Sequence, residues 1–380
     1  MEILLESIDK DIVKNPYSSI IQWSEQRLKF VGKKTFPVLA LMPVSLIAPD
    51  MPFKDTSVRL NIHTLILAHS GAGKTSLARA FGEITINNKF INKISESSFT
   101  YELAPYKNIP LSLVCGDVDR IFKDPDLMKD LESALGEEKN IDVRNQRRKH
   151  SFDIDLIFLG AGLPSAITKI NFMKGLFRRT CPIFIFYSEE NLHAIYNYWS
   201  NTIYESLIQK TSNNDIASSE IHNYYLKLFN IQRGIDREFK GKKIDSYIVE
   251  KKFVDELNEY HGKLTKLFPK GMSLITELQS GFRYMFSHAM LNYFNRKIES
   301  DKNKNKIVID EIDCEIAKGL LYREMMTKSM LITIRNTLDS KNIDEIHEGI
   351  MTDDNSELAF TWNSLIDTFI GEKTNKKTKE

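Results

Sequence analysis

The chain has 380 residues, of which 42% are hydrophobic and 27% are charged, and its formal net charge is +1. About two or three domains are expected at this length, and the composition is that of an ordinary soluble globular protein. A net charge so near zero excludes a molecule drawn to nucleic acid by a global positive field, so any nucleic-acid surface must be a local patch.

The cysteines and the N-terminus bear on the compartment. Cys115, Cys181 and Cys314 lie far apart, form no C-x-x-C pair and fit a reducing environment, so we expect a cytoplasmic protein. The N-terminus is acidic and amphipathic, which predicts no signal peptide. The most apolar stretch, 36–51, is interrupted by prolines and falls short of the ~20 residues that span a bilayer, so we expect buried helix and no membrane partner.

The chain divides into blocks of different pattern. Residues 1–55 have a helical pattern and form an N-terminal lead-in. Residues 56–195 alternate helical patterns with short apolar runs, at 64–67, 111–115, 154–159 and 182–187. This alternation predicts an α/β core, a parallel sheet with helices on both faces. The rest predicts a helical accessory region, a helical lid-like domain and a disordered tail, at 196–275, 276–370 and 371–380.

The most specific motif follows the apolar run Thr64–Leu67. It matches the phosphate-binding P-loop G-x-x-x-x-G-K-[ST], with Ala68 in place of the first glycine. Small residues there let successive backbone N–H groups point at a phosphate, and the next helix adds its positive end. The residues expected to bind nucleotide are His69, Ser70, Gly71, Ala72, Gly73, Lys74, Thr75 and Ser76.

The residue types in this motif predict ATP and Mg²⁺ as ligands. Gly71 and Gly73 permit positive φ angles and a close approach of the backbone. Lys74 can reach the β- and γ-phosphates, and the Thr75 hydroxyl can ligate Mg²⁺. The alternative is a glycine-rich turn that matches by chance, which the strand-loop-helix order makes unfavourable.

Hydrolysis also needs a carboxylate near Mg²⁺ and a residue that polarises water, at the end of a neighbouring strand. The run Leu111–Cys115 predicts a buried strand, and Asp117 follows it at the edge where parallel sheets bind ligands. We predict Asp117 as the acid on the Mg²⁺ side and Asp119 as the polarising residue, although Val118 separates them. Substitutes for the second role are Glu132, Glu137 and Glu138. The alternative is an acidic turn after a core strand.

Two further features belong to the same region. The next apolar strand ends in Gly160-Ala-Gly162, where many ATPases of this type carry a polar sensor of the γ-phosphate. Arg178 and Arg179 precede the last apolar strand, and an arginine at this position in a ring ATPase stabilises charge on the neighbouring subunit's γ-phosphate. The alternative is a basic pair that contacts solvent or a local carboxylate.

The densest basic segment lies between the second and third of the catalytic strands. Its cations are Arg144, Arg147, Arg148 and Lys149, followed by His150. In ring translocases, loops or hairpins at this place project into the pore, where cations neutralise phosphates without reading sequence. The alternative is a solvated basic helix end.

The order of these elements resembles the AAA+ and superfamily III type of helicase ATPases. It is most similar to the primase-helicase and MCM-like proteins of plasmids, phages and archaeal mobile elements. The P-loop, the strand before Asp117, the glycine-ended strand and Gly175–Arg179 carry the likeness. The resemblance implies a P-loop NTPase fold, and an ATPase that acts on DNA without sequence preference as a homo-oligomeric ring, such as a hexamer.

The resemblance continues toward the C-terminus. Ser280–Leu291 is similar to a lid helix that begins with an arginine, which implies that Arg283 touches the γ-phosphate as a second sensor. The alternative is an arginine that flanks the core of an amphipathic helix. Ile307–Lys318 is similar to the strand and acidic helix that follow the lid.

Two other functions remain open. A nucleotide-switched assembly, regulatory or defence protein is favoured by the large helical region that matches nothing in the family. A small-molecule kinase is a weaker alternative, because the paired arginines and the long helical block argue against it.

Overall fold

A computed structural model gives the fold of the chain. It describes residues 4–27, 36–53, 56–68, 73–91, 101–107, 109–118, 121–136, 140–145, 148–163, 175–185, 197, 216–239, 243–244, 246–268, 274–297 and 306–340. Within these residues, no helix is both long enough and apolar enough to cross a membrane.

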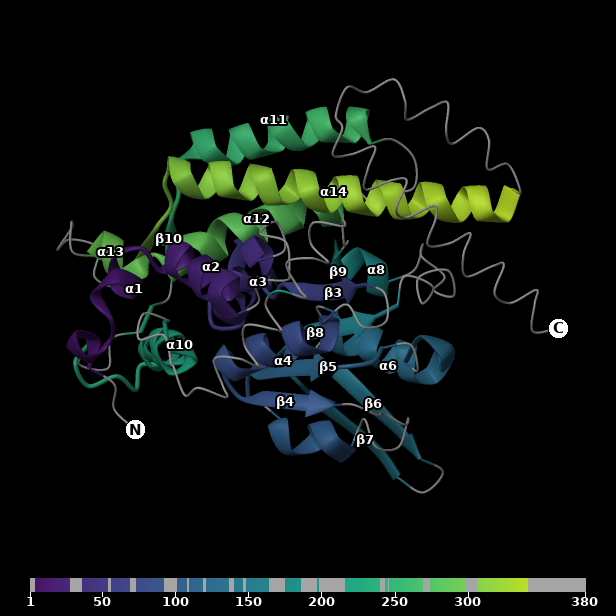
Figure 1. Ribbon diagram of the computed structural model, residues 1–380, viewed down its shortest axis with the longest axis horizontal. Coiled ribbons are helices and arrows are strands. Elements are labelled where there is room, and N and C mark those ends of the chain that lie inside the picture. The colour runs from purple at the N-terminus through teal and green to yellow at the C-terminus, as the bar shows by residue number, and fades with distance from the viewer. Residues whose placement is uncertain are drawn as a thin grey trace.

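The centre of the fold is a five-stranded parallel sheet with the order β4-β5-β8-β3-β9 (Figure 1). Its strands are β3 (His63–Leu67), β4 (Asn88–Ile91), β5 (Leu111–Cys115), β8 (Leu156–Gly162) and β9 (Thr180–Phe184). β3, β5 and β8 are buried along their whole length, as expected of strands covered on both faces. The predicted α/β fold with a parallel sheet is confirmed.

Helices cover both faces of this sheet. Alternate residues of β3 belong to different cores, because side chains alternate across a strand: Ile66 packs in one core and Leu65 and Leu67 in the other. The first core includes residues of α3 (Phe36–Ser45) and α4 (Lys74–Ile84). The second includes residues of α6 (Pro125–Leu135) and α8 (Leu176–Arg179).

Helices α11 (Lys251–Leu267), α14 (Glu311–Ser340) and α12 (Leu274–Leu291) form a layer above the sheet and are stacked in that order (Figure 1). α13 (Tyr293–Lys297) follows α12 in the chain, and α10 (Ser218–Gln232) packs on α4. The N-terminal elements are a 3₁₀ helix (Leu5–Ser7), α1 (Lys10–Lys14) and α2 (Pro16–Arg27). α12 packs on both α14 and α3, and α14 reaches β9, so this layer is joined to the sheet.

One hydrophobic core includes residues from the first four of the predicted blocks. It includes Trp23 of α2, Phe81 of α4, and Met285 and Leu321 of α12 and α14. The divisions predicted at residues 55 and 276 therefore separate segments that share a core, and they stay predictions.

Three short strand pairs accompany the main sheet. They are β1 (Met51–Phe53) with β2 (Thr56–Val58), β6 (Asn140–Asn145) with β7 (Arg148–Asp153), and β10 (Ser246–Ile248) with β11 (Lys306–Val308). The pair β6–β7 is an antiparallel hairpin, and Figure 1 shows it extending away from the central sheet. Two more 3₁₀ helices lie at Ala104–Tyr106 and Ile121–Lys123.

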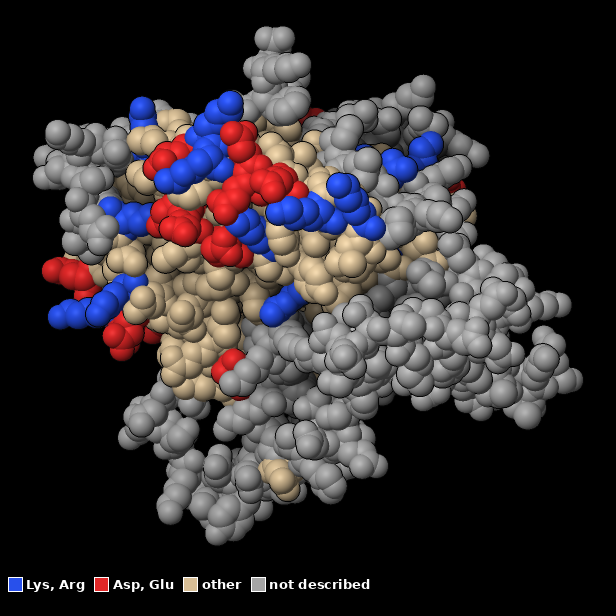
Figure 2. Space-filling model, turned by 90° about the horizontal axis from the view of Figure 1, so that it is seen from above, with Lys and Arg blue, Asp and Glu red and all other residues tan. Residues whose placement is uncertain are grey.

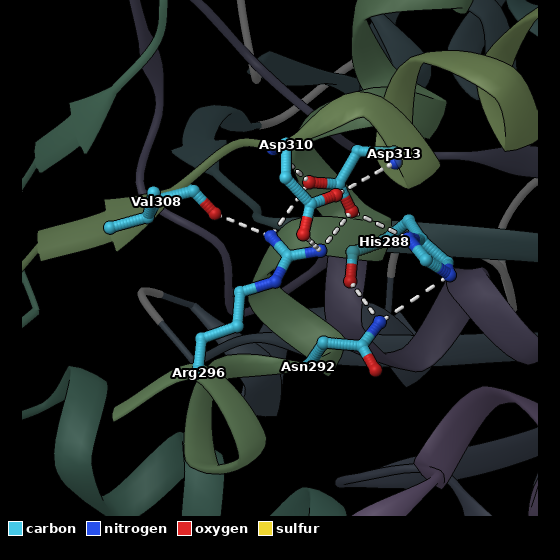
Figure 3. Close-up of polar contacts among 6 residues, drawn as sticks. All are labelled: His288, Asn292, Arg296, Val308, Asp310 and Asp313. Atoms are coloured by element: carbon cyan, nitrogen blue, oxygen red, sulfur yellow. Dashed lines mark hydrogen bonds and ion pairs between the residues drawn. The ribbon is translucent and has the colours of Figure 1, made fainter. Parts of the chain in front are cut away.

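A buried polar network fixes the start of α14 (Figure 3). Asp310 and Asp313 cap the helix reciprocally: the Asp310 N–H donates to Asp313 Oδ2 at 2.9 Å, and the Asp313 N–H donates to Asp310 Oδ1 at 3.2 Å. The fully buried Asp313 carboxylate also accepts two bonds from Arg296, at 2.6 and 2.7 Å, and lies 2.6 Å from His288 Nδ1. Arg296 donates to the Val308 carbonyl as well, so α12, α13, β11 and α14 meet here.

Candidate functional site

The P-loop motif lies at the carboxyl end of β3, where the chain turns into α4. Gly73 has φ +67° and directly precedes the helix, a conformation that glycine adopts without steric cost. α4 begins at Lys74, and Lys74 and Thr75 lie in its first turn. His69, Ser70, Gly71 and Ala72 lie outside the described residues.

The start of α4 contacts the end of β5. The Thr75 hydroxyl donates to the Gly116 carbonyl oxygen at 3.3 Å, and Gly116 directly precedes Asp117. Asp117 is exposed at this edge of the sheet, whereas its neighbours Gly116 and Val118 are buried. The structure therefore brings the predicted Mg²⁺ ligand Thr75 close to the segment that carries the predicted acid. Asp119 lies outside the described residues.

β5 is not the direct neighbour of β3, contrary to the expectation from sequence. β8 lies between them and pairs with both. The small residues at its carboxyl end occupy the position predicted for a polar sensor, and they have a packing role. A Cβ on Gly160 would lie 2.7 Å from Val118 Cγ1 and from the Phe158 ring, so only glycine lets Val118 pack there. Val118 N–H also donates to the Ala161 carbonyl at 2.9 Å, which fixes the segment after Asp117 on β8.

The arginine pair lies at the opposite edge of the sheet. Arg178 and Arg179 end α8, which leads into the amino end of β9, and Thr180 pairs with His63 at the amino end of β3. The five residues of β3 separate this edge from the P-loop, which is ~16 Å of strand. These arginines therefore lie far from the P-loop motif of their own chain.

The two arginines differ in their surroundings. Arg179 Nη1 lies 3.1 Å from Glu132 Oε1 of α6, so this arginine contacts a local carboxylate, the alternative raised from sequence. Arg178 is exposed. The same contact places Glu132 at the arginine edge, away from the P-loop where the substitute for Asp119 is needed. Glu137 and Glu138 lie outside the described residues.

Arg283 also lies at the arginine edge. It is in the middle of α12, and its Nε donates to the Arg59 carbonyl at 3.1 Å. A small cavity there is lined by His63, Arg179 and Arg283. The structure does not bring Arg283 to the P-loop motif of its own chain, and α12 begins nine residues before Arg283 rather than at it. The second-sensor role stays a prediction, and this geometry does not support it.

His63 is held neutral among these cations. Burial lowers its pKa well below the ordinary value, and the positive charges of Arg283 and Arg59 lower it further. Its Nδ1 accepts the backbone N–H of Phe158 at 3.3 Å, so the neutral ring joins β3 to β8.

A buried ionic cluster next to α8 was not predicted from the sequence. It consists of Lys328 and Glu324 of α14 with Glu277, Ser280 and Tyr284 of α12, and we call it the Lys328 cluster. The signal in the sequence is helical spacing: Glu324 and Lys328 are four residues apart, and Glu277, Ser280 and Tyr284 share one face of α12. That spacing alone does not show what the cluster contacts.

The basic segment forms the β6–β7 hairpin, not the helix end considered as the alternative. The backbone pairs Arg144 with Lys149 and Asn145 with Arg148, and Gln146 and Arg147 lie outside the described residues. The basic residues therefore gather at the tip of an element that extends from the sheet.

The helical face of the molecule offers a different charge pattern. Figure 2, which looks down on α11 and α14, shows Lys and Arg beside Asp and Glu. Lys263 pairs with Glu259 at 2.8 Å, and Lys318 pairs with Glu256 and Glu315 at 2.7 Å. Among the described residues of this face, such alternation presents no basic track to a phosphate backbone.

Among the described residues, no group of three or more His, Cys, Asp and Glu side chains is arranged to hold a metal ion. A magnesium ion that also binds substrate phosphates needs only one or two protein oxygens, so the pair Thr75 and Asp117 is a sufficient donor set.

Comparison with known proteins assigns the chain to no family. No protein-family model matches the chain, and no curated protein matches it significantly.

Proposed function

We propose that the chain is an ATP-dependent motor of the AAA+ or superfamily III type, which hydrolyses ATP and moves along DNA as a homo-oligomer. The contact of the Thr75 hydroxyl with the Gly116 carbonyl carries the proposal. It joins the start of the P-loop helix to the strand end that bears Asp117, and a glycine-rich turn with no nucleotide function has no need of an acid there.

The residues at this edge suit a triphosphate. The N-terminus of α4 favours negative charge, and Lys74 supplies a cation for the β- and γ-phosphates. Thr75 and Asp117 offer the hard oxygen donors that Mg²⁺ prefers, and these two residues would hold the ion. Bound Mg²⁺ neutralises charge on the β- and γ-phosphates.

The strand order also supports the proposal. β8 ends between β3 and β5, which is where a strand must end to approach the γ-phosphate between the P-loop and the acid. In this chain that strand end consists of glycine and alanine, which offer no polar side chain to the γ-phosphate. ATP hydrolysis would therefore depend on Asp117 and on a residue of the neighbouring subunit.

The site is completed by a second copy of the chain. Arg178 lies too far from its own P-loop but is exposed at the other edge of the sheet, as an arginine that serves a neighbour must be. DNA is assigned to the tip of the β6–β7 hairpin, because the basic residues converge there and the helical face is mixed in charge.

Lys74→Ala tests the site. We expect it to lower ATP hydrolysis roughly 10²-fold or more, because the cation acts where charge develops on the transferred phosphate. Lys89→Ala is the matched control: Lys89 lies on the edge strand β4, pairs with Glu102 at 3.1 Å, and should leave hydrolysis unchanged. The measurement is phosphate release with and without single-stranded DNA, which should raise the wild-type rate.

Two outcomes would count against the proposal. Hydrolysis that survives Lys74→Ala would remove the P-loop from the active site. Slow hydrolysis that no DNA stimulates, together with ATP-dependent oligomerisation, would instead identify the nucleotide-switched assembly protein.

A further inference from the structure

The Lys328 cluster holds a lysine in a place where burial is costly. Lys328 is 1% exposed, and Glu324 and Glu277 are each 2% exposed. Burial lowers the pKa of the Lys328 ammonium, but the charges of Glu324 and Glu277 outweigh it and raise the pKa, so the ammonium stays protonated. Burial, opposed by Lys328 and reinforced by Glu324, raises the pKa of Glu277. Apolar side chains of similar volume commonly stabilise a core as well as or better than a buried ion pair, so stability alone does not explain this lysine.

The ammonium is oriented by several fixed groups. It lies 2.5 Å from Glu324 Oε1 and 3.7 Å from Glu277 Oε1. Glu324 is itself held by the Tyr284 hydroxyl at 2.6 Å and the Ser280 hydroxyl at 3.2 Å. α12 therefore fixes the carboxylate that fixes the lysine.

The remaining donor capacity of Lys328 is directed at α8. Its Nζ donates to the carbonyl oxygen of Arg178 at 3.4 Å and lies 5.7 Å from the centre of the Phe177 ring. The carbonyls at the end of a helix have no partner within the helix, and a lysine from another element can satisfy one. Lys328 thus caps the four-residue helix that carries the arginine pair.

α8 is held from two sides. The Glu132–Arg179 pair ties it to α6, and Lys328 ties it to α14. Between these two anchors, the side chain that is presented to the outside is that of Arg178.

We propose that Lys328 and Glu324 are positioning residues for Arg178, through which α14 controls ATP hydrolysis at the P-loop of the neighbouring subunit. This inference rests on the proposed function. In this inference, Arg178 acts on the γ-phosphate bound to the neighbouring subunit. Arg179 holds α8 on α6 through its pair with Glu132.

Mixed assemblies test the inference. Lys74→Ala subunits keep Arg178 but lack a working P-loop, and Arg178→Ala subunits keep the P-loop but lack the arginine. Mixing these two should restore hydrolysis, because one supplies the P-loop and the other the arginine at a shared site. If this mixture stays inactive, the proposed function fails, whatever Lys328 does.

Lys328→Met is then mixed with each of the two. If Lys328→Met misplaces Arg178, the variant still has a working P-loop. Mixing it with Lys74→Ala subunits, which supply an intact Arg178, should then restore hydrolysis. Mixing it with Arg178→Ala subunits, which supply none, should not. Alone, Lys328→Met should lower kcat ~10- to 100-fold at unchanged KM, against roughly 10³-fold for Arg178→Ala, since an arginine of this kind is worth 10³–10⁵ in rate. Rescue by Arg178→Ala subunits, or by neither, would overturn the inference.

Two further variants separate positioning from folding. Lys318→Met makes the same change on the same helix, at a lysine that pairs with α11 and not α8, and should keep wild-type hydrolysis. Lys328→Met/Glu324→Gln removes the unpaired buried carboxylate, so its thermal midpoint should recover above that of Lys328→Met while hydrolysis stays low. Recovery of hydrolysis together with stability would mean that the cluster is only structural.

Discussion

Gly160 lies where β8 passes Val118, the residue after Asp117. A side chain at this position would meet Val118 and Phe158 at 2.7 Å, and both neighbours are buried and unable to move freely. The absence of a side chain at the predicted sensor position is therefore what allows the segment with Asp117 to pack against β8.

Gly160→Ala should both destabilise the protein and impair the site. We expect a loss of ~1–3 kcal/mol in the free energy of unfolding, because the added methyl group overpacks a filled core. ATP hydrolysis under native conditions should fall as well, since Val118 and with it Asp117 must shift. Urea unfolding and phosphate release measure the two effects.

Gly319→Ala is the control for that substitution. A Cβ on Gly319 meets no atom within 4 Å, and the residue lies inside α14. Alanine there should stabilise the protein by ~0.5–1 kcal/mol through helix propensity and leave hydrolysis unchanged. Equal behaviour of the two variants would contradict the packing role of Gly160.

Among the elements, the β6–β7 hairpin has the clearest separation from the core. It lies between α6 and β8 in the chain, yet it extends away from the sheet to which β8 belongs. Residues at the tip of such an element can be substituted without destabilising the core. This suits a contact with DNA phosphates, which depends on charge and not on base sequence.

Arg144→Gln/Arg148→Gln/Lys149→Gln should weaken binding to all DNA sequences alike. Each phosphate contact that is lost should reduce the slope of log K against log salt by ~0.7 for single strands. Binding of labelled single-stranded DNA at several salt concentrations measures it. Lys251→Gln/Lys252→Gln/Lys263→Gln removes the same charge from α11, and an equal loss of slope there would assign the effect to net charge instead of the hairpin.

At the scale of the whole molecule, the network around Asp313 joins the parts of the helical layer. It links α12, α13, β11 and α14 through one buried carboxylate. Burial raises the pKa of this carboxyl, but the hydrogen bonds from His288 and Arg296 outweigh burial and hold it below its usual value of 3.8.

This pKa shift predicts a loss of stability in acid. The unfolded chain binds the Asp313 proton at a higher pH than the folded chain, so the contribution is complete above pH 3.8 and lost as the pH falls through the lower folded pKa. Asp313→Asn should cost ~3–5 kcal/mol at neutral pH, because it leaves Arg296 without its buried partner, and should remove this part of the acid dependence. Glu259→Gln, at an exposed pair on α11, should leave the unfolding midpoint unchanged. Denaturation at several pH values measures both.

Local pattern was enough to predict part of this molecule. The apolar runs at 64–67, 111–115, 154–159 and 182–187 gave four of the five central strands. β4, at Asn88–Ile91, was missed because two of its four residues are polar, as an edge strand permits.

Long-range contacts account for what the sequence could not predict. The contact of Lys328 with Arg178 joins residues 150 positions apart, and helical spacing cannot reveal it. Arg283 was expected at a phosphate because of its place in a lid-like helix, but in the fold it contacts the Arg59 carbonyl, in the segment before β3. For the candidate site, motif spacing predicts a P-loop, which stays a prediction, whereas the contact of Thr75 with Gly116 could be found only from the fold.

The position of the P-loop and Arg178 at opposite edges of one sheet restricts the symmetry of any assembly that shares them. A two-fold dimer joins the same patch of both protomers, so it can share these groups only if one patch contains both edges. A heterologous, head-to-tail contact has no such requirement, and its repetition gives either a closed cycle or an open filament. An open filament always ends in one P-loop without an arginine, whereas closure completes every site at once.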